Sequence, residues 1–328
     1  MTGPALPAGA VIGVTGATGH IGQVLVERLL RQDVEVRSVA RRPLAPLGAR
    51  RLSHTCADVR SPEARRALEG TDLVFHLAAQ VWEGRGRGAP EAMRQVNVEG
   101  ARNVLAGAPR ALVLASSAVV YGAWPDNPLP LVEDHPARPN PECRYAADKL
   151  AAEAACQRSD GRFAIVRLCA VLGPHADVRV ARALSGYRLG VPEVSGCPQA
   201  AQWMDEGDAA EALLCVGADL LGPGKAAGQV LNAATADWLS APDMARLAHS
   251  RTVRAPRGLV VAAAELGHRA RLSPFGADRA VLICGPLALS PEKAKRLVSW
   301  QPRLTSAEVF SAALARGSQG GRRNRTLA

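Results

Sequence analysis

The sequence predicts an α/β fold, a doubly wound parallel sheet of Rossmann type with helices on both faces and a smaller, irregular C-terminal substrate lobe. Apolar strand-like runs alternate with helix-like runs through the first half of the chain. The strand-like runs are apolar over most of their length, which is typical of strands buried on both faces. The first strand-like run leads through a glycine-rich turn into an amphipathic helix pattern.

The elements follow one another in a regular order up to Gly173-Pro174. Strands are expected at residues 10–15, 34–39, 52–56, 72–79, 111–117 and 163–169. Helices are expected at residues 20–32, 61–70, 91–108 and 144–155. Beyond Pro174 the pattern becomes irregular, with a helix at about 207–219, a strand at 228–234 and a final helix near 305–315.

These patterns predict a division of the chain into unequal parts. Residues 1–173 should form a dinucleotide-binding Rossmann domain, to which residues 203–235 return. Residues 174–202 and 236–316 should form the substrate-binding lobe. The basic segment 317–328 reads as a flexible tail.

Composition argues against several classes of partner. The net charge is +10, but 36 of the 40 basic residues are arginine and aromatic residues make up only 4% of the chain. Without aromatic residues between the charges, this excess does not indicate nucleic-acid binding. No run approaches about 18 uninterrupted apolar residues, so we expect no membrane span.

Cysteine usage indicates a reducing compartment. The seven cysteines are scattered and form no CxxC pair. We therefore expect reduced thiols, no disulfide framework and no metal site. The first ten residues also lack the basic and apolar regions of a signal peptide, so we expect a cytoplasmic protein.

The glycine turn has the spacing expected for a dinucleotide. Gly16, Gly19 and Gly22 follow the G-x-x-G-x-x-G pattern between a strand and a helix. Gly16 permits a tight turn, Gly19 lets the backbone approach a pyrophosphate, and Gly22 allows close packing of helix on strand. The N-terminus of the helix then offers free N–H groups to the phosphates.

Tyr145 and Lys149 are candidates for proton transfer. They are four residues apart in the helical run RYAADKLAAEAA and should share one face. A fixed positive charge favours phenolate and lowers the pKa of a tyrosine. Lowering that pKa from about 10 to about 7 requires roughly 4 kcal/mol of differential stabilisation.

The end of the second strand favours NADP over NAD. NAD usually calls for an acid there, to bind the ribose hydroxyls. Here the strand ends in Ala40, Arg41 and Arg42, while Glu35 stands at its start. Arg41 or Arg42 would pair with the 2′-phosphate of NADP; NAD remains the alternative.

Together these motifs resemble the extended short-chain dehydrogenase/reductases, in particular the NAD(P)-dependent epimerase/dehydratase family. The resemblance covers roughly residues 10–215, with a weaker match near 290–310. The motifs TGATGHIG, HLAAQ, LASSAVVYG, RYAADK and VRLCAVLGP stand in the order typical of the family. The segments QWMDEGDAAEALL and AKRLVSWQPR are similar to its later signatures.

The resemblance assigns a role to each matching residue. It implies that Tyr145 is the general acid/base, that Lys149 binds the nicotinamide ribose and lowers the Tyr145 pKa, and that Ser117 hydrogen-bonds the reacting oxygen. With the turn and the two arginines, it implies cofactor contacts from Gly16, Thr18, Gly19, His20, Ile21, Gly22, Arg41, Arg42, Asp58, Val59, Leu77, Ala78, Ala79, Asn97 and Lys149. We expect His76 to be a packed core histidine.

Departures from the family pattern narrow the reaction. Sugar dehydratases of the family place a Glu, or Asp-Glu, directly after the catalytic Ser or Thr, whereas Ala118 and Val119 follow Ser117 here. The segment also lacks the cysteine of reductases that epimerise neighbouring carbons. We therefore expect ketoreduction or C4 epimerisation of a nucleotide-linked sugar by hydride transfer.

Two alternative functions stay open. In the first, the enzyme reduces a non-sugar ketone of steroid, flavonoid or polyketide type. In the second, the chain is a non-catalytic dinucleotide sensor.

A homodimer through helices at about 89–108 and 141–158 is compatible with their apolar stripes.

Overall fold

A single parallel sheet organises the protein. The computed structural model describes residues 4–44, 50–82, 88–107, 109–273 and 275–323. Seven strands pair in the order β10-β6-β5-β4-β1-β2-β3, and every pair is parallel. The strands are β1 (Val11–Thr15), β2 (Glu35–Ala40), β3 (Leu52–Cys56), β4 (Leu73–His76), β5 (Ala111–Ser117), β6 (Arg162–Leu168) and β10 (Gln229–Ala233). This confirms the predicted doubly wound fold.

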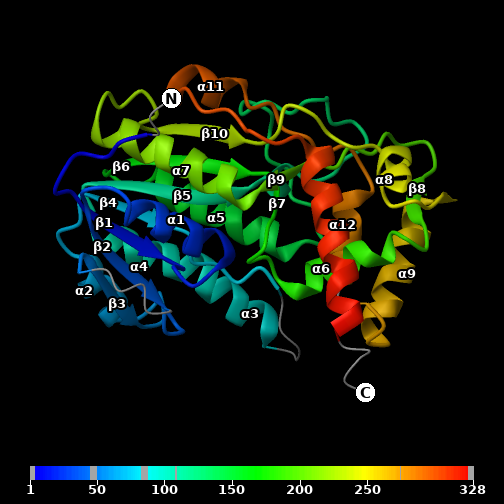
Figure 1. Ribbon diagram of the computed structural model, residues 1–328, viewed down its shortest axis with the longest axis horizontal. Helices are drawn as coiled ribbons and strands as arrows, with labels where there is room; N and C mark the ends of the chain where they lie inside the picture. Colours follow the sequence, from blue (N-terminus) through cyan, green and yellow to red (C-terminus); the bar gives the residue numbers. More distant parts are fainter. Residues whose placement is uncertain (1–3, 45–49, 83–87, 108, 274, 324–328) are drawn as a thin grey trace.

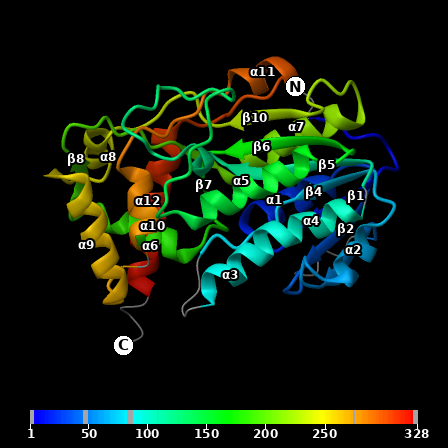
Figure 2. The same ribbon diagram turned by 180° about the vertical axis from the view of Figure 1, so that it is seen from behind.

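Helices cover both faces of the sheet. Helices α1 (His20–Leu29) and α7 (Glu206–Leu221) lie side by side on one face (Figure 1). Helices α2 (Pro62–Leu68), α4 (Gly100–Ala106) and α5 (Arg144–Gln157) cover the other face (Figure 2). Each face has its own apolar core, with Leu25 and Leu213 buried on the first side and Leu112 and Ile165 on the second. The central strands are therefore apolar on both sides, as the sequence indicated.

The helix expected over residues 91–108 is interrupted. It begins as α3 (Ala89–Arg94), widens into the π-helical turn η1 (Gln95–Glu99) and continues as α4. A π turn inserts one extra residue into the helix and is common at functional sites. Asn97, one of the predicted cofactor residues, lies within this turn.

The chain returns to the sheet after its first excursion. A short parallel ladder joins β7 (Ala170–Leu172) to β9 (Trp203–Asp205), and α7 and β10 then extend the main body. Helix α11 (Glu292–Val298) packs beside β10 and α7.

The remaining elements gather at one end of the sheet (Figures 1 and 2). They are α6 (Val178–Gly186), β8 (Val191–Val194), α8 (Ala241–Leu247), β11 (Thr252–Ala255), α9 (Arg257–Arg269), α10 (Ala277–Ala280), the 3-10 turn η3 (Val281–Ile283) and α12 (Ser306–Arg323). Their own core includes Leu184, Met244 and Phe310. Helix α12 extends to Arg323, so the predicted tail is helical over its first part; residues 324–328 lie outside the described residues.

No helix within the described ranges combines the length and apolar character needed to cross a bilayer.

Candidate active site

The turn between β1 and α1 requires glycine at two positions. Gly16 has a φ of +71°, and a Cβ atom there would lie 2.8 Å from the backbone nitrogen of Ala78. A Cβ atom on Gly22 would lie 2.2 Å from the carbonyl oxygen of Gly16. Gly19 is the N-cap of α1 and supplies no side chain to the first N–H groups. The turn therefore has the close packing and the free helix N-terminus that suit a dinucleotide pyrophosphate.

The segment after β4 lies directly against this turn. The backbone N–H of Ala78 donates to the Thr15 hydroxyl over 3.2 Å, and that hydroxyl lies 2.8 Å from Nδ1 of His76. Burial, with a smaller contribution from the Lys149 charge, lowers the pKa of His76 to about 3. His76 is therefore a neutral core histidine, as expected, and Leu77, Ala78 and Ala79 are only partly covered.

Asn97 holds the next residue of that segment in place. Its Oδ1 accepts a hydrogen bond from the backbone nitrogen of Gln80 at 2.7 Å, and its Nδ2 donates to the Gln80 carbonyl at 3.0 Å. The same Nδ2 lies 3.3 Å from a carboxylate oxygen of Asp148 on α5. The π turn thus links the segment after β4 to the residue that precedes Lys149.

The outer edge of the site carries Asp58, Val59 and the two arginines. Asp58 forms a two-point ion pair with Arg60, at 2.8 and 2.9 Å, and the Arg60 guanidinium holds the pKa of Asp58 below its usual value. Val59 is buried against Gly100, where an added Cβ would lie 2.5 Å away.

Arg41 and Arg42 are exposed just beyond β2, and Arg42 donates to the Thr18 carbonyl over 3.1 Å. Glu35, at the other end of β2, is exposed and paired with Arg37. No acid stands at the carboxyl end of this strand.

His20 and Ile21 follow Gly19 in the first turn of α1. Both are partly exposed. Nε2 of His20 lies 3.5 Å from a carboxylate oxygen of buried Glu206, whose other oxygen lies 2.7 Å from Nδ1 of His175. A pair of imidazoles around one carboxylate therefore joins the glycine turn to the start of the C-terminal lobe. The sequence reasoning missed this contact, because residues 20, 175 and 206 have no local pattern in common.

Tyr145 and Lys149 lie on α5, which packs against the end of β5 where Ser117 stands. Nζ of Lys149 donates to the carbonyl of Ala115 at 2.8 Å and lies 5.8 Å from the centre of the Tyr145 ring. Ser117 ends β5 and caps the short 3-10 helix η2 (Ala118–Tyr121). The hydrogen bond to Ala115, two residues before Ser117, holds the lysine of α5 at the end of β5.

The electrostatics differ from the sequence expectation. Burial lowers the pKa of Lys149 to about 8, and the charge of Glu153 opposes this shift. Burial also raises the pKa of Tyr145, and Arg279 is the cation that opposes that rise. The expected lowering of the Tyr145 pKa by Lys149 is thus not found, because removal of the phenolate from water has the larger effect.

A buried ion pair lies behind Lys149. Glu153, one helical turn further along α5, accepts a hydrogen bond from Ser116 Oγ and pairs with Arg167 at 2.7 Å. The Arg167 guanidinium lies 4.6 Å from the ring centre of Tyr121, whose hydroxyl donates to Asn232 at 3.0 Å. The i, i+4 spacing of Lys149 and Glu153 was the only available sequence signal for this network.

The C-terminal lobe contributes Arg279 and Phe275 near Tyr145. Neither was predicted, since more than a hundred residues separate them from α5. They meet Trp82, which follows the HLAAQ segment closely in the sequence.

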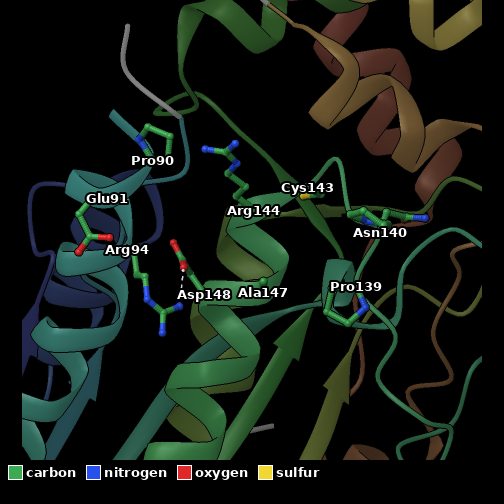
Figure 3. Close-up of a pocket in the computed structure, with 10 residues that line it drawn as sticks. Pro90, Glu91, Arg94, Pro139, Asn140, Cys143, Arg144, Ala147 and Asp148 are labelled. Carbon is green, nitrogen blue, oxygen red and sulfur yellow. Dashed lines mark ion pairs between the residues drawn. The ribbon is translucent and has the colours of Figure 1, made fainter. Parts of the chain in front are cut away.

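A shallow pocket of about 300 Å³ lies beside the start of α5, between α3 and the loop before α5 (Figure 3). Pro90, Arg94, Asn140 and Asp148 are among its lining residues, and Arg94 pairs with Asp148 at 3.5 Å across it. Tyr145, Lys149 and Ser117 do not line it. The pocket is therefore distinct from the place where the predicted catalytic residues meet.

Metal ligands and activated thiols are not found in the site. The described residues contain no group of three or more histidine, cysteine or acidic side chains placed to hold a metal. Burial raises the pKa of Cys143, and raises that of Cys169 to about 12, so both are protonated thiols at neutral pH.

Comparison with known proteins finds relatives that match part of the chain. A protein of Mycobacterium tuberculosis without an assigned function is 30% identical over 222 residues, which cover 62% of this chain and 58% of that protein. A 3-beta-hydroxysteroid dehydrogenase of Mycolicibacterium neoaurum is 38% identical over 120 residues, 33% of this chain and 32% of that enzyme. This chain thus spans little more than half of the first relative's length.

Solved structures show the same fold over nearly the whole chain. The UDP-glucose 4-epimerase of Thermotoga maritima, solved with UDP-glucose, superposes with a TM-score of 0.71 at 18% identity, over 94% of this chain and 99% of that chain. The model of the NAD dependent epimerase/dehydratase family matches residues 12–234. The glycine turn, the parallel sheet and this match lead to one conclusion: the chain belongs to the NAD dependent epimerase/dehydratase family.

Proposed function

We propose that the protein is an NAD(P)-dependent oxidoreductase that interconverts a ketone and a secondary alcohol. One observation carries the proposal: Tyr145 and Lys149 lie together on α5, and Lys149 is bound to the carbonyl of Ala115 near the carboxyl end of β5, the strand that ends at Ser117. In open α/β sheets, ligands bind at the carboxyl ends of the strands. The glycine turn at the end of β1 lies at the same edge of the sheet.

Each residue has one task in this proposal. Tyr145 donates its phenolic proton to the substrate oxygen in reduction and takes it back in oxidation. Ser117 donates a hydrogen bond to the same oxygen as negative charge develops. Lys149 binds the ribose of the cofactor and favours the phenolate as a nearby cation. The bound nicotinamide supplies or accepts the hydride.

Because Tyr145 is buried, loss of its phenolic proton requires positive charge near the ring. Burial opposes phenolate formation at Tyr145, so the proton transfer needs the cations around the ring. Lys149 and Arg279 lie 5.8 and 5.4 Å from the ring centre. Both supply positive charge at the moment when the phenol loses its proton.

Dehydration of a sugar is disfavoured by the residues after Ser117. Ala118 is buried and Val119 is apolar, and neither can exchange a proton with a carbon next to the reacting centre. The proposal is therefore simple hydride chemistry, as net ketoreduction or as C4 epimerisation.

NADP is the proposed cofactor, with NAD as the alternative. The support is the pair of exposed guanidinium groups, Arg41 and Arg42, just beyond β2, where an acid would favour NAD. Comparison of NADPH and NADH binding for the wild type and for Arg41→Ala and Arg42→Ala tests this. We expect at least one variant to lose NADPH affinity with little change for NADH; unchanged NADPH affinity in both would reject the assignment.

Two substrate classes follow from different observations. A nucleotide-linked sugar is supported by the likeness to an epimerase solved with UDP-glucose. A non-sugar ketone is supported by the partly buried Val119, Val261 and Leu282, which pack against the same small core as Tyr145, and by the stacked Trp82 and Phe275. Initial rates of NADPH oxidation with keto-sugar nucleotides and with apolar ketones separate the two classes.

A non-catalytic sensor would bind NADPH and turn over no member of that panel. We propose in addition that any dimer forms through the helices at about 89–108 and 141–158, which sedimentation of the wild type at several concentrations would test.

A further inference from the structure

Aromatic and cationic side chains from three parts of the chain meet beside Tyr145. Trp82 and Phe275 stack with ring centres 5.1 Å apart and 15° between their planes. The guanidinium carbon of Arg279 lies 4.8 Å from the centre of the Trp82 ring and 5.4 Å from the centre of the Tyr145 ring. Arg279 therefore places a permanent positive charge directly beside the proposed acid/base.

The position of Arg279 is fixed from several sides. Its Nη2 donates to the carbonyl of Val81, and its Nε lies 3.3 Å from a carboxylate oxygen of Asp278. The Trp82 ring supports the guanidinium by a cation–π contact. A group held in this way is preorganised to bind an anion, because its rotamer freedom is already lost.

Arg279 nevertheless keeps unused donor capacity. Its side chain is only 15% exposed, yet within the part of the chain that the structure describes its Nε is a buried donor without a hydrogen-bond acceptor. A buried donor without a partner is costly, so an acceptor brought by a ligand would stabilise the site. Asp278 offsets part of the charge but accepts no hydrogen bond from Nε.

The neighbouring arginine offers a contrast. The guanidinium carbon of Arg179 also lies 4.8 Å from the centre of the Trp82 ring. Its Nε, however, donates to both carboxylate oxygens of Asp177 at 3.0 Å, and no contact joins it to Tyr145 among the described aromatic pairs. Of these two arginines, Arg279 is the one with a free donor beside the proposed acid/base.

We propose that Arg279 is a substrate-recognition residue that binds the carboxylate of an otherwise apolar keto acid. The carboxylate would lie within a few bonds of the reacting carbonyl, since the guanidinium stands over the Tyr145 ring. A guanidinium matches a carboxylate with parallel hydrogen bonds, and the partly buried Val119, Val261 and Leu282, which pack on the same small core as Tyr145, would provide apolar contact for the rest of the molecule.

This inference rests on the proposed function, because it takes Tyr145 as the group that meets the carbonyl. In the reaction the hydride adds to the carbonyl carbon and the Tyr145 proton to its oxygen. The ketone becomes a secondary alcohol, the cofactor is oxidised and the carboxylate is unchanged.

The test compares an acid with its neutral ester in four proteins. Initial rates with NADPH and with NADH are measured for 3-benzoylpropionate and its methyl ester. The proteins are the wild type, Arg279→Met, Arg279→Lys and the matched control Arg179→Met. We expect the wild type to prefer the acid. In Arg279→Met, loss of the cation beside Tyr145 should lower kcat for both substrates, whereas KM should rise about 30-fold or more for the acid alone.

The pattern across the variants separates recognition from a structural role. Arg279→Lys should keep part of the preference for the acid, and Arg179→Met should keep all of it. Equal losses of kcat/KM for acid and ester in Arg279→Met would show that its charge acts only on Tyr145 or on the fold, and would overturn the proposal. An unchanged preference for the acid in Arg279→Met would also overturn it. So would weaker UDP-glucose binding in that variant, if the wild type shows no preference for the acid.

A binding experiment keeps the inference independent of turnover. Calorimetric titration of the NADP-loaded proteins uses 4-phenylbutyrate and its methyl ester, which lack a ketone. We expect the wild type to bind the acid more tightly than the ester and Arg279→Met to show no such difference. If this difference holds while every ketone fails to react, the proposed function is rejected and the recognition role stands. Turnover without Arg279-dependent binding of the acid rejects the recognition role alone.

Discussion

Relative to the wild type, Lys149→Met should become more stable as pH falls, even though the substitution removes a proposed catalytic group. The pKa of Lys149 drops from 10.5 to about 8 when the chain folds, and desolvation is the main cause. The unfolded chain therefore binds more protons than the native state between these two values. As pH rises through that window, loss of the Lys149 proton raises the free energy of unfolding of the wild type. Below about pH 8 this gain is absent.

The magnitude follows from the size of the shift. A difference of about 2.5 units, at about 1.36 kcal/mol per unit, gives a cost of about 3 kcal/mol near neutral pH. Loss of the hydrogen bond to the Ala115 carbonyl works in the opposite direction, by about 1 kcal/mol at any pH. The pH-dependent part can therefore be separated from the constant part.

Urea unfolding of the wild type and of Lys149→Met, followed by circular dichroism from pH 7 to pH 10, measures the pH-dependent part of the difference in their free energies of unfolding. The difference in free energy of unfolding between the two proteins should shift by about 2 to 3 kcal/mol in favour of the wild type over that range. The buried cysteines also titrate there, but they are common to both proteins and cancel. Lys225→Met, at an exposed lysine, is the control and should differ from the wild type by a constant amount. A constant difference for Lys149→Met, or a shift of opposite sign, would refute the reasoning.

Three further substitutions test other parts of the site. Gly22→Ala places a Cβ 2.2 Å from the Gly16 carbonyl, so NADPH affinity by fluorescence titration should fall at least about tenfold, whereas Gly186→Ala in open space should leave it unchanged. Asn97→Ala leaves both backbone groups of Gln80 without their side-chain partner and should lower the free energy of unfolding by about 1 to 3 kcal/mol. A loss below about 0.5 kcal/mol, roughly the scatter of surface substitutions, would contradict the anchoring role of Asn97. Glu153→Leu leaves buried Arg167 unpaired and should cost about 3 to 5 kcal/mol in urea unfolding, and an unchanged midpoint would disprove the importance of the pair.

The parts of the fold with a local cause were predictable. The strands of the sheet follow from apolar runs, and the turn at Gly16 and Gly22 follows from the spacing of glycines between a strand and a helix. Tyr145 and Lys149 were found because helical periodicity puts them on one face. In each case a few neighbouring residues decide the structure.

The parts decided by tertiary contact were not predictable. Arg279 and Phe275 reach the site from the C-terminal lobe, where the sequence has no strong periodicity. The π turn around Asn97 arises within a helix pattern that predicted no interruption. The direction of the Tyr145 pKa also depends on how deeply the ring is buried, and burial is a property of the assembled lobes rather than of the RYAADK segment.

The most direct measurement of the central claim is turnover by Tyr145→Phe. Phenylalanine keeps the ring and its packing against Arg279 and Lys149 and removes only the phenolic proton. With a ketone that the wild type reduces, kcat should fall by a factor on the order of 10² to 10⁴, while NADPH binding and the urea midpoint stay close to those of the wild type. Wild-type turnover in this folded, cofactor-binding variant would contradict the role of Tyr145 as the acid/base.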